Sequence, residues 1–427
     1  MRISSGSSAI PSSIFGASRG ALTVLTIACV MNLLGRGFME THAIFMLSLE
    51  QEFDWSRTEV SGIYSVAMLT FGFSGPAVGF LLDRLGPTRV YISGLLLIIT
   101  GLTISSTSDS LWTFRITQGL MMGFGVASLS TVSLTALLSR WFEHHLSTAI
   151  AFAYATMGLG VMLFSPLVES LSEEFGWRQS YRMLALIGII GLPMAWLLLR
   201  LRADHGNPVI HQRLAESGRS NPVESSVGVG DALRTFEFWG LAWVYFMTGV
   251  GSFTVLLQAP AYLVDMGYST SFAAKTFGAV GLFAPVGIIG ITVLSRRFGQ
   301  TPMILLSYAL SFLGVLCLLG FERSSMMFLL VLFVLLYGGT LGCRAPIISA
   351  LATQCFNGPS LGQIYGLIII ASGMGAAVGA YLGGWLYELS GDYRYGAMLS
   401  MGMFLIGNLP FWLIPRLTRW KLDSLIS

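Results

Sequence analysis

Long apolar blocks constrain this chain more than any other feature of its sequence. The first block runs from about Leu22 to Leu49, and further blocks of 20 or more residues follow it. A helix of about 20 apolar residues crosses a bilayer core of about 30 Å. The mean hydropathy is +0.72, and only 11% of the residues are charged, whereas soluble domains contain about 25% charged residues. The sequence therefore predicts a polytopic, all-α membrane protein.

Charges, glycines and prolines divide the chain into twelve predicted spans. Their limits are 20–47, 58–82, 88–107, 111–139, 146–171, 179–201, 238–264, 270–295, 301–320, 325–355, 361–388 and 395–415. One long polar stretch separates six spans from six and is predicted to be a linker. The expected organisation is an N-terminal segment (1–19), a six-helix bundle (20–202), a linker (203–237), a second six-helix bundle (238–418) and a tail (419–427).

The distribution of basic residues predicts the orientation. If the N-terminus is cytoplasmic, 15 of the 24 Lys and Arg residues fall on the cytoplasmic side, six on the opposite side and three inside spans. Cytoplasmic segments are enriched in Lys and Arg, so both termini are predicted to be cytoplasmic. The polar run 1–18 does not look like a signal peptide. The expected location is a bacterial inner membrane, with the protein a monomer among lipids.

Several kinds of partner and chemistry are not expected. The net charge of +3 gives no reason to expect a nucleic-acid partner. The four cysteines have neither paired nor metal-like spacing and are interpreted as reduced packing residues. No phosphate-binding loop, metal cluster or Ser–His–Asp constellation stands out, so no cofactor and no enzymatic activity are expected. Energy would then come from a gradient of ions or substrate.

The two halves of the chain repeat each other. "RWFEHHLSTAIAFAYATMGLG" (140–160) lies over "QCFNGPSLGQIYGLIIIASGMG" (354–375), and "DRLG" (83–86) lies over "RRFG" (296–299). In the first alignment, Gly158 and Gly160 match Gly373 and Gly375. Parallel repeats of this kind place a substrate site near the midplane, between the halves.

Two motifs carry a family resemblance. "GFLLDRLGPTRV" (79–90) and "FRITQG" (114–119) resemble the second-to-third-span loop motif and the fourth-span motif of the major facilitator superfamily. The resemblance covers the whole chain and implies twelve helices in two pseudo-symmetric six-helix bundles. It also implies that Asp83, Arg84 and Arg89 form a cytoplasmic gate, and that Arg115 acts in gating or proton coupling. Structural hydrogen bonding is the alternative for Arg115.

The fifth span points to one branch of that superfamily. "WFEHHLSTAIAFAYA" (141–155) resembles the signature of monocarboxylate transporters and oxalate–formate antiporters, which suggests a carboxylate substrate. The chain departs from that branch in two places. The first span lacks its acidic–glycine–aromatic signature, and the eighth span lacks its arginine.

Three arginines lie inside predicted spans: Arg36, Arg115 and Arg344. Each costs about 2.5–3.5 kcal/mol at a helix centre unless it has a partner or a wet cavity. In the superfamily the first, fourth, seventh and tenth helices line the cavity, so Arg36 and Arg344 can hold an anion from both halves. The alternatives are an Arg36–Glu40 ion pair and helix-to-helix hydrogen bonds from Arg344. Arg344 has no acid within four residues, which favours it as the anion ligand.

Arg36 belongs to "GRGFMETH" (35–42), which also holds two candidate proton carriers. Glu40 can hold Arg36 when it is ionised and release it when it is protonated, as a proton-coupled carrier requires. His42 can also titrate, but a hydrogen-bonded structural histidine is the alternative.

Polar stripes on three spans, and single tyrosines on the fifth and eleventh spans, add candidate substrate ligands. They are Ser128, Thr131 and Thr135; Tyr245, Thr248 and Ser252; Tyr337 and Thr340 with Arg344; and Tyr154 and Tyr365. Hydrogen bonds between packed helices are the alternative for each. Gly75 and Gly79 are interpreted as close-packing positions.

The favoured hypothesis is a proton-coupled symporter for a small organic anion that works by alternating access. A proton-driven exporter of drug-like amphiphiles is the first alternative, although "SPLVE" (165–169) replaces the glycine-rich motif of such antiporters. The second alternative is a receptor or membrane enzyme that transports nothing.

Overall fold

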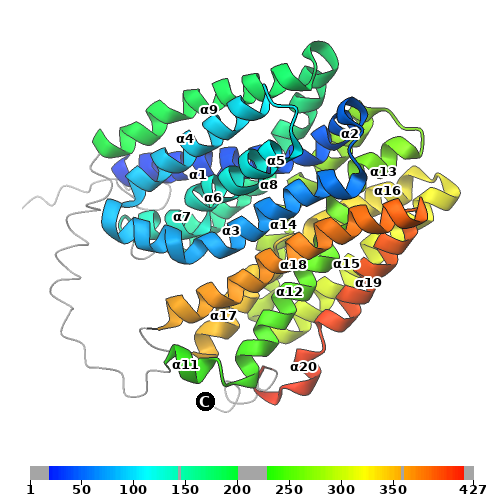
Figure 1. Cartoon of the computed structure of the whole chain (residues 1–427). Helices are drawn as coiled ribbons and strands as arrows, with labels where there is room; N and C mark the ends of the chain where they lie inside the picture. Colours follow the sequence, from blue (N-terminus) through cyan, green and yellow to red (C-terminus); the bar gives the residue numbers. More distant parts are fainter. Residues whose placement is uncertain (1–18, 143–145, 201–227, 357–359, 418–427) are drawn as a thin grey trace, which may run out of the picture.

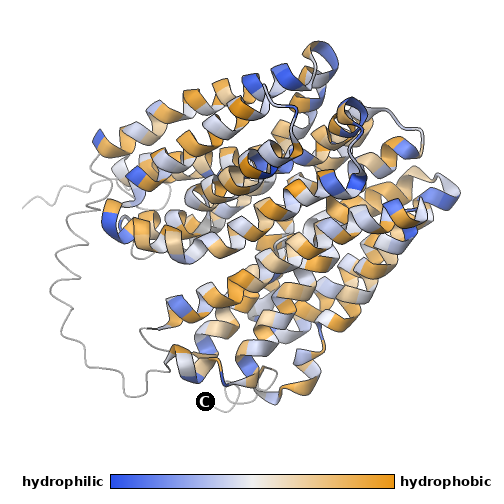
Figure 2. Cartoon of the chain, in the orientation of Figure 1, coloured by the Kyte–Doolittle hydropathy of each residue, from blue (hydrophilic) through white to orange (hydrophobic). Residues whose placement is uncertain are grey.

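The computed structural model describes residues 19–142, 146–200, 228–356 and 360–417, and within these ranges the chain forms helices and no strands (Figure 1). Eleven helices in this part are long and apolar enough to cross a membrane, and Met327–Gly338 is a shorter apolar helix. Hydrophilic residues gather at the helix ends, and apolar residues cover the middle (Figure 2). The predicted all-α membrane architecture is confirmed.

The first half contains the helices of the first six predicted spans. They are α1 (Arg19–Glu40), α2 (His42–Phe53), α3 (Arg57–Leu85), α4 (Pro87–Ser105), α5 (Leu111–Phe114), the π-helix η2 (Arg115–Met121), α6 (Met122–Leu129), α7 (Thr131–Leu138), α8 (Leu146–Phe175) and α9 (Trp177–Arg200). Ser56 and Glu59 form a capping box at the start of α3. This motif fixes where α3 begins, because each side chain satisfies a free backbone amide.

The second half contains α11 (Val229–Ala232), which lies in the predicted linker, and the helices of the other six predicted spans. These are α12 (Phe236–Leu256), α13 (Ala259–Asp265), α14 (Thr270–Phe298), α15 (Gln300–Ser324), α16 (Met327–Phe333), the π-helix η4 (Val334–Gly338), α17 (Arg344–Cys355), α18 (Leu361–Ser390), α19 (Arg394–Gly407), α20 (Pro410–Leu413) and the 3₁₀-helix η5 (Pro415–Leu417).

The linker predicted over 203–237 lies mostly outside the described residues. Its last part contains α11 and the first two residues of α12. Thr235 accepts a hydrogen bond from the Phe238 amide at 3.3 Å, and this N-cap sets the start of α12 before the predicted limit of 238.

Five spans that were predicted as continuous helices are interrupted. The first breaks at Thr41, the fourth at Ser130, the seventh at Leu257 and Gln258, the tenth at residues 341–343, and the twelfth at Asn408 and Leu409. Gly342 in the break of the tenth span has φ +78, a conformation that a residue without a Cβ adopts easily. Irregular backbone at membrane depth occurs where protein or a cavity covers it. The breaks in the first, fourth and seventh spans are buried and therefore lie in the interior of the molecule.

The repeated glycines lie at matched contacts in the two halves. A Cβ on Gly160 would meet the backbone of Leu33 and Gly37 in α1, and one on Gly375 would meet the backbone of Phe246 in α12. Their neighbours Gly158 and Gly373 make the contacts between halves, to Gly281 of α14 and Gly72 of α3 respectively. Glycine is required here because two helix backbones touch.

The two halves meet at one end of the molecule and separate at the other. We call these the α2 end, where α2 and α13 lie, and the α17 end, where α7, α11 and α17 lie (Figure 1). Helices α3 and α18 run antiparallel and are in close contact from Ser61 and Gly384 to Gly72 and Gly373.

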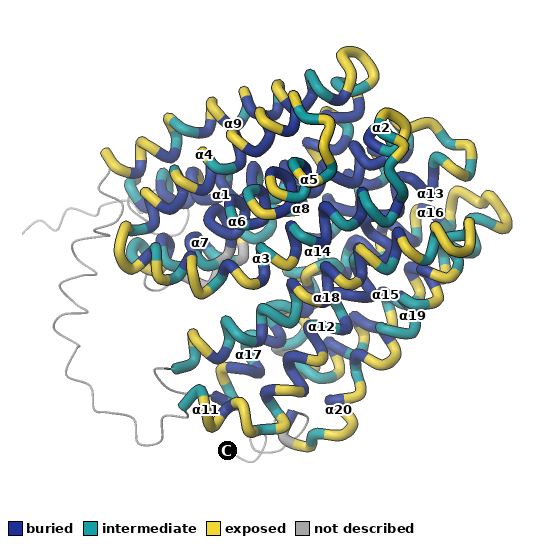
Figure 3. Tube along the Cα trace, viewed as in Figure 1, coloured by how far each residue is buried: buried dark blue, intermediate teal, exposed yellow. Residues whose placement is uncertain are grey.

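Beyond Gly72 and Gly373 the two helices diverge. A Cβ on Gly75 or Gly79 of α3, or on Gly362 or Gly366 of α18, would meet no atom within 4 Å. The interpretation of Gly75 and Gly79 as close-packing positions is therefore wrong for this conformation. The last turns of α3 carry both buried and exposed residues (Figure 3). Because α3 and α18 are in contact only up to Gly72 and Gly373, the molecule is closed at the α2 end and open at the α17 end.

Candidate functional site

A buried ion pair lies where the first span is interrupted. Arg36 Nη2 is 2.6 Å from Glu40 Oε1, and the side chain of Glu40 is only 3% exposed. The two residues are one turn apart on α1, and Glu40 is the last residue of that helix. The hydroxyl of Tyr64 on α3 donates a hydrogen bond to Glu40 Oε2 at 3.0 Å. The ion-pair alternative for Arg36 is therefore the arrangement present in this conformation.

The opposite half also contacts this ion pair. The guanidinium of Arg36 lies 5.9 Å from the ring centroid of Phe253 on α12, and the Tyr64 ring lies 6.0 Å from the same ring. Arg36 is 15% exposed, more than its partner Glu40. The charged pair therefore lies at the interface between the halves, with an aromatic face beside the cation.

Sequence reasoning missed Tyr64 and Phe253. A signal for Tyr64 was available, because Arg57, Ser61, Tyr64, Met68 and Gly72 recur every three or four residues and are all buried. This spacing places them on one face of α3. No comparable pattern singles out Phe253, which is one of 28 phenylalanines in the chain.

His42 is buried and hydrogen-bonded, as expected for a structural histidine. Its Nε2 lies 3.0 Å from the carbonyl oxygen of Val60, and its ring stacks on Tyr64 with centroids 5.8 Å apart. The side chain is 5% exposed. His42 therefore supports the ring of Tyr64, and through it Glu40.

Arg344 points into its own half and contacts α15. Its Nε and Nη2 donate to the hydroxyls of Ser307 and Ser311 at 3.0 and 2.5 Å, and Nη2 also donates to the Ser307 carbonyl at 2.9 Å. The guanidinium lies 4.1 Å from the Tyr308 ring centroid. Arg344 is 2% exposed. These are the hydrogen bonds between helices that were the alternative role for Arg344. In this structure Arg344 does not face Arg36 across an open site.

Three of the predicted tyrosines come together. The hydroxyls of Tyr245 on α12 and Tyr365 on α18 are 3.0 Å apart, and Tyr154 of α8 lies near them. Tyr245 precedes Phe253 by eight residues on α12, or about 12 Å of helix. The tyrosine cluster thus lies on the α17 side of the ion pair, where the halves diverge.

Other predicted ligands are engaged in helix packing. Ser128 is fully buried and donates to the Phe124 carbonyl at 3.0 Å. The hydroxyls of Thr340 and Ser311 lie 2.7 Å apart. The side chain of Thr131 lies outside the described part of the chain.

Arg115 and the predicted gate residues lie apart from the ion pair. Arg115 begins η2 at the α2 end, with its guanidinium 4.9 Å from the Trp112 ring centroid.

The predicted gate residues lie near the α3–α4 turn, where Asp83, Arg84 and Arg89 are exposed and Arg84 lies over Phe80. Within the described residues neither these three nor Arg115 forms an ion pair. At the open α17 end, a latch from Asp83, Arg84 and Arg89 to the other half is not engaged.

Comparison with known proteins gives the fold its family. The family model described as Major Facilitator Superfamily matches residues 25–321 and 286–424. The chain belongs to the major facilitator superfamily. It is therefore a transporter with the predicted twelve-helix fold, and not an enzyme. No group of three or more His, Cys, Asp or Glu side chains in the described ranges could hold a metal ion.

Three relatives show which members of the superfamily this transporter resembles. It is 23% identical to human monocarboxylate transporter 2 over 406 residues, which is 90% of this chain and 83% of the relative. It is 25% identical to rat monocarboxylate transporter 13 over 376 residues, covering 87% of this chain and 83% of the relative. An uncharacterized MFS-type transporter of Bacillus subtilis, YcxA, is 22% identical over 376 residues, covering 87% and 89%.

Proposed function

We propose that this transporter moves a small organic anion of the monocarboxylate type together with a proton, by alternating access. The observation that carries the proposal is the buried Arg36–Glu40 pair, which lies at a helix interruption between the halves. The relatives named monocarboxylate transporters support the substrate class.

The chemistry follows from competition for one guanidinium. A substrate carboxylate and the Glu40 carboxylate both suit the fork of Arg36. When Glu40 takes up a proton it loses its charge, so Arg36 can bind the substrate instead. Tyr64 holds the Glu40 carboxyl in place, and Phe253 offers an apolar face to a short hydrocarbon tail.

The proposed orientation places the α2 end outside a plasma membrane and the α17 end in the cytoplasm. This follows the excess of Lys and Arg on the α17 side of the predicted spans. The conformation described above is then open to the cytoplasm. Substrate from that side meets Tyr154, Tyr245 and Tyr365 before it reaches Arg36, and Asp83, Arg84 and Arg89 would latch that entrance when it closes.

The test is uptake of radiolabelled lactate into proteoliposomes with an imposed pH gradient. Arg36→Gln should lower uptake at least about tenfold, because one charge-assisted contact is worth about 1.5–3 kcal/mol. Glu40→Gln should keep lactate exchange but abolish accumulation driven by the pH gradient. Arg178→Gln is the control, because Arg178 is ion-paired to Asp109 at a distance from the site.

The alternative function makes an opposite prediction. In that case the proteoliposomes transport lipophilic cations but not lactate, and Arg36→Gln does not change the transport of the cations. This result would identify an exporter of drug-like amphiphiles and overturn the proposal.

A further inference from the structure

The α2 end is held closed by polar contacts between the two halves. Arg57 begins α3 and is 8% exposed. Its Nη1 donates to the hydroxyl of Tyr393, which lies between α18 and α19, at 2.6 Å, and its Cζ lies 4.5 Å from the Tyr387 ring centroid of α18. Both tyrosines belong to the C-terminal half, so Arg57 joins the halves.

Acidic residues on both sides of the interface position these groups. Glu50 of α2 forms an ion pair with Arg57, with Glu50 Oε1 and Arg57 Nε 2.7 Å apart. The hydroxyls of Tyr387 and Tyr393 donate to Asp265 Oδ2, at 2.8 and 2.9 Å. Burial raises the pKa of Tyr393 above its ordinary value, so its hydroxyl keeps its proton and links Arg57 to Asp265.

Two further contacts extend this connection along α3. Thr58 donates from both its amide and its hydroxyl to Glu388 of α18. Four residues after Arg57, Ser61 accepts a hydrogen bond from Gln258 Nε2 at 2.9 Å. Ser61 is fully buried and Gln258 is 3% exposed, and a Cβ on Gly384 would meet Ser61 Oγ at 2.6 Å. Glycine at 384 therefore lets α18 approach α3 closely enough for these bonds.

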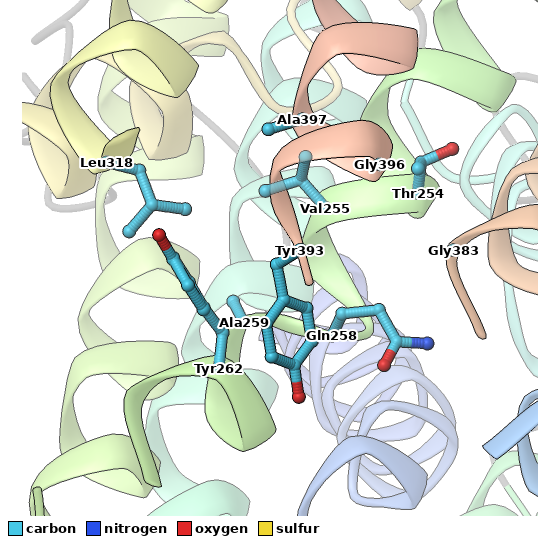
Figure 4. A pocket seen from close by; sticks show the side chains of 10 residues that line it. All are labelled: Thr254, Val255, Gln258, Ala259, Tyr262, Leu318, Gly383, Tyr393, Gly396 and Ala397. Carbon is cyan, nitrogen blue, oxygen red and sulfur yellow. The ribbon is translucent and has the colours of Figure 1, made fainter. Parts of the chain in front are cut away.

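A small cavity lies directly behind the contact. It has a volume of about 20 Å³, and both Gln258 and Tyr393 line it, together with Thr254, Tyr262 and Leu318 (Figure 4). That volume admits about one water molecule. The Oε1 of Gln258 is buried without a hydrogen-bond partner in the described structure. Gln258 and Tyr393 thus have free space beside them, which close-packed side chains lack.

We propose that Arg57, Tyr393, Asp265 and Glu388 form a latch that closes the α2 end, with Ser61–Gln258 as its inner bond. The latch contacts between the halves are Arg57–Tyr393, Thr58–Glu388 and Ser61–Gln258, and all three must break when the α2 end opens. Asp265 and Glu388 are exposed and can take water in exchange, so breaking the contacts leaves few charges stranded. Such a latch sets the balance between two states rather than the stability of either half.

The test measures this balance directly, without any substrate. Spin labels are placed on Gln51→Cys of α2 and Lys275→Cys of α14, two exposed positions on opposite halves. The four native cysteines are replaced by alanine. Distances between the labels are measured by pulsed electron paramagnetic resonance on protein in lipid nanodiscs.

In Arg57→Gln we expect the ratio of open to closed α2 ends to rise about tenfold, equivalent to about 1.4 kcal/mol. Tyr393→Phe, which removes one hydroxyl and keeps the ring, should shift the distances in the same direction. Arg178→Gln is the matched control, since this arginine lies at the same end but pairs with Asp109 and Glu52 of its own half.

Unchanged distances in both Arg57→Gln and Tyr393→Phe, with the proteins monodisperse, would overturn the latch. An equal shift in Arg178→Gln would also overturn it, because any charge loss at that end would then have the same effect. Because no substrate is present, neither result depends on whether the protein carries organic anions.

Discussion

An arginine within a membrane span needs partners for its five N–H donors, and Arg36 and Arg344 meet this need differently. Arg344 donates to Ser307 and Ser311 of α15 and lies over aromatic rings. Arg36 has one acidic partner and remains partly accessible at 15% exposure. An ion pair with a single carboxylate can be exchanged for another carboxylate, whereas a network of hydroxyl and carbonyl acceptors cannot. Arg36 is therefore the arginine we propose as the anion ligand, whereas Arg344 holds α17 against α15.

Arg344→Gln and Arg36→Gln should consequently have opposite effects. We expect Arg344→Gln to lower the thermal unfolding temperature of the purified protein, since each charge-assisted hydrogen bond that is lost contributes about 1.5–3 kcal/mol. Arg36→Gln should change the unfolding temperature less and transport more. An Arg344→Gln protein that unfolds like the parent but binds no lactate would instead support direct anion binding by Arg344.

At the scale of single residues, the sequence located the Arg36–Glu40 pair because its partners are four residues apart on one helix. It could not locate Tyr64 and Phe253, because contacts across helices depend on packing that no local spacing encodes. The same limit applies to Arg344. Its acceptors Ser307 and Ser311 lie more than 30 residues away in sequence. The residues within four positions of Arg344 therefore do not indicate its partners.

At the scale of helices, the approach of α3 to α18 depends on two glycines. A Cβ on Gly72 would meet Gly373 Cα at 2.9 Å, and a Cβ on Gly373 would meet Gly72 Cα at 2.6 Å. Further along α3, a Cβ on Gly75 or Gly79 would meet no atom of a neighbouring helix within 4 Å. The contact is thus limited to the part of α3 nearer the α2 end.

Gly72→Ala should therefore destabilise the protein by about 1–3 kcal/mol, the usual effect of overpacking, as measured by its thermal unfolding. Gly75→Ala and Gly79→Ala are controls on the same helix, and we expect them to be neutral or slightly stabilising, because alanine favours helix more than glycine does. Equal destabilisation by all three substitutions would mean that α3 and α18 are packed along their whole length.

The helix pattern was largely predictable, and its interruptions were not. Apolar blocks, caps and charges gave the number and order of spans. The breaks at Thr41, Ser130, Gln258 and Gly342 have weak local signals, since Thr, Ser and Gln are ordinary residues of membrane helices. The breaks at Thr41, Ser130 and Gln258 are buried among neighbouring helices, which is a property of the assembled bundle. A prediction that considers one helix at a time therefore continues each helix through its break.

At the scale of the whole molecule, alternating access requires the α17 end to close when the α2 end opens. Gly79 and Gly366 each lie seven residues beyond the Gly72–Gly373 contact, on opposite helices, and meet nothing in this conformation. If the halves rock about that contact, these two positions approach each other.

Cysteines at Gly79 and Gly366 should then form a disulfide slowly under mild oxidation, because only the other conformation brings their Cβ atoms within about 3.5–4.5 Å. Cysteines at Thr58 and Glu388 should form one sooner, since Glu388 already accepts hydrogen bonds from Thr58 in this conformation. Each disulfide should stop transport until it is reduced. Rapid linkage of the first pair in the resting protein would contradict the divergence of α3 and α18.

The pairing of Arg36 with Glu40 has an electrical consequence. The empty site has no net charge, and a site holding one carboxylate and one added proton has none either. Moving one elementary charge across 100 mV involves about 2.3 kcal/mol, so a carrier whose loaded and empty forms are both neutral does not respond to membrane voltage. We expect lactate uptake to be unchanged when a potassium gradient and valinomycin impose a voltage of either sign. An uptake rate that follows the voltage would show that charge crosses the membrane with each cycle.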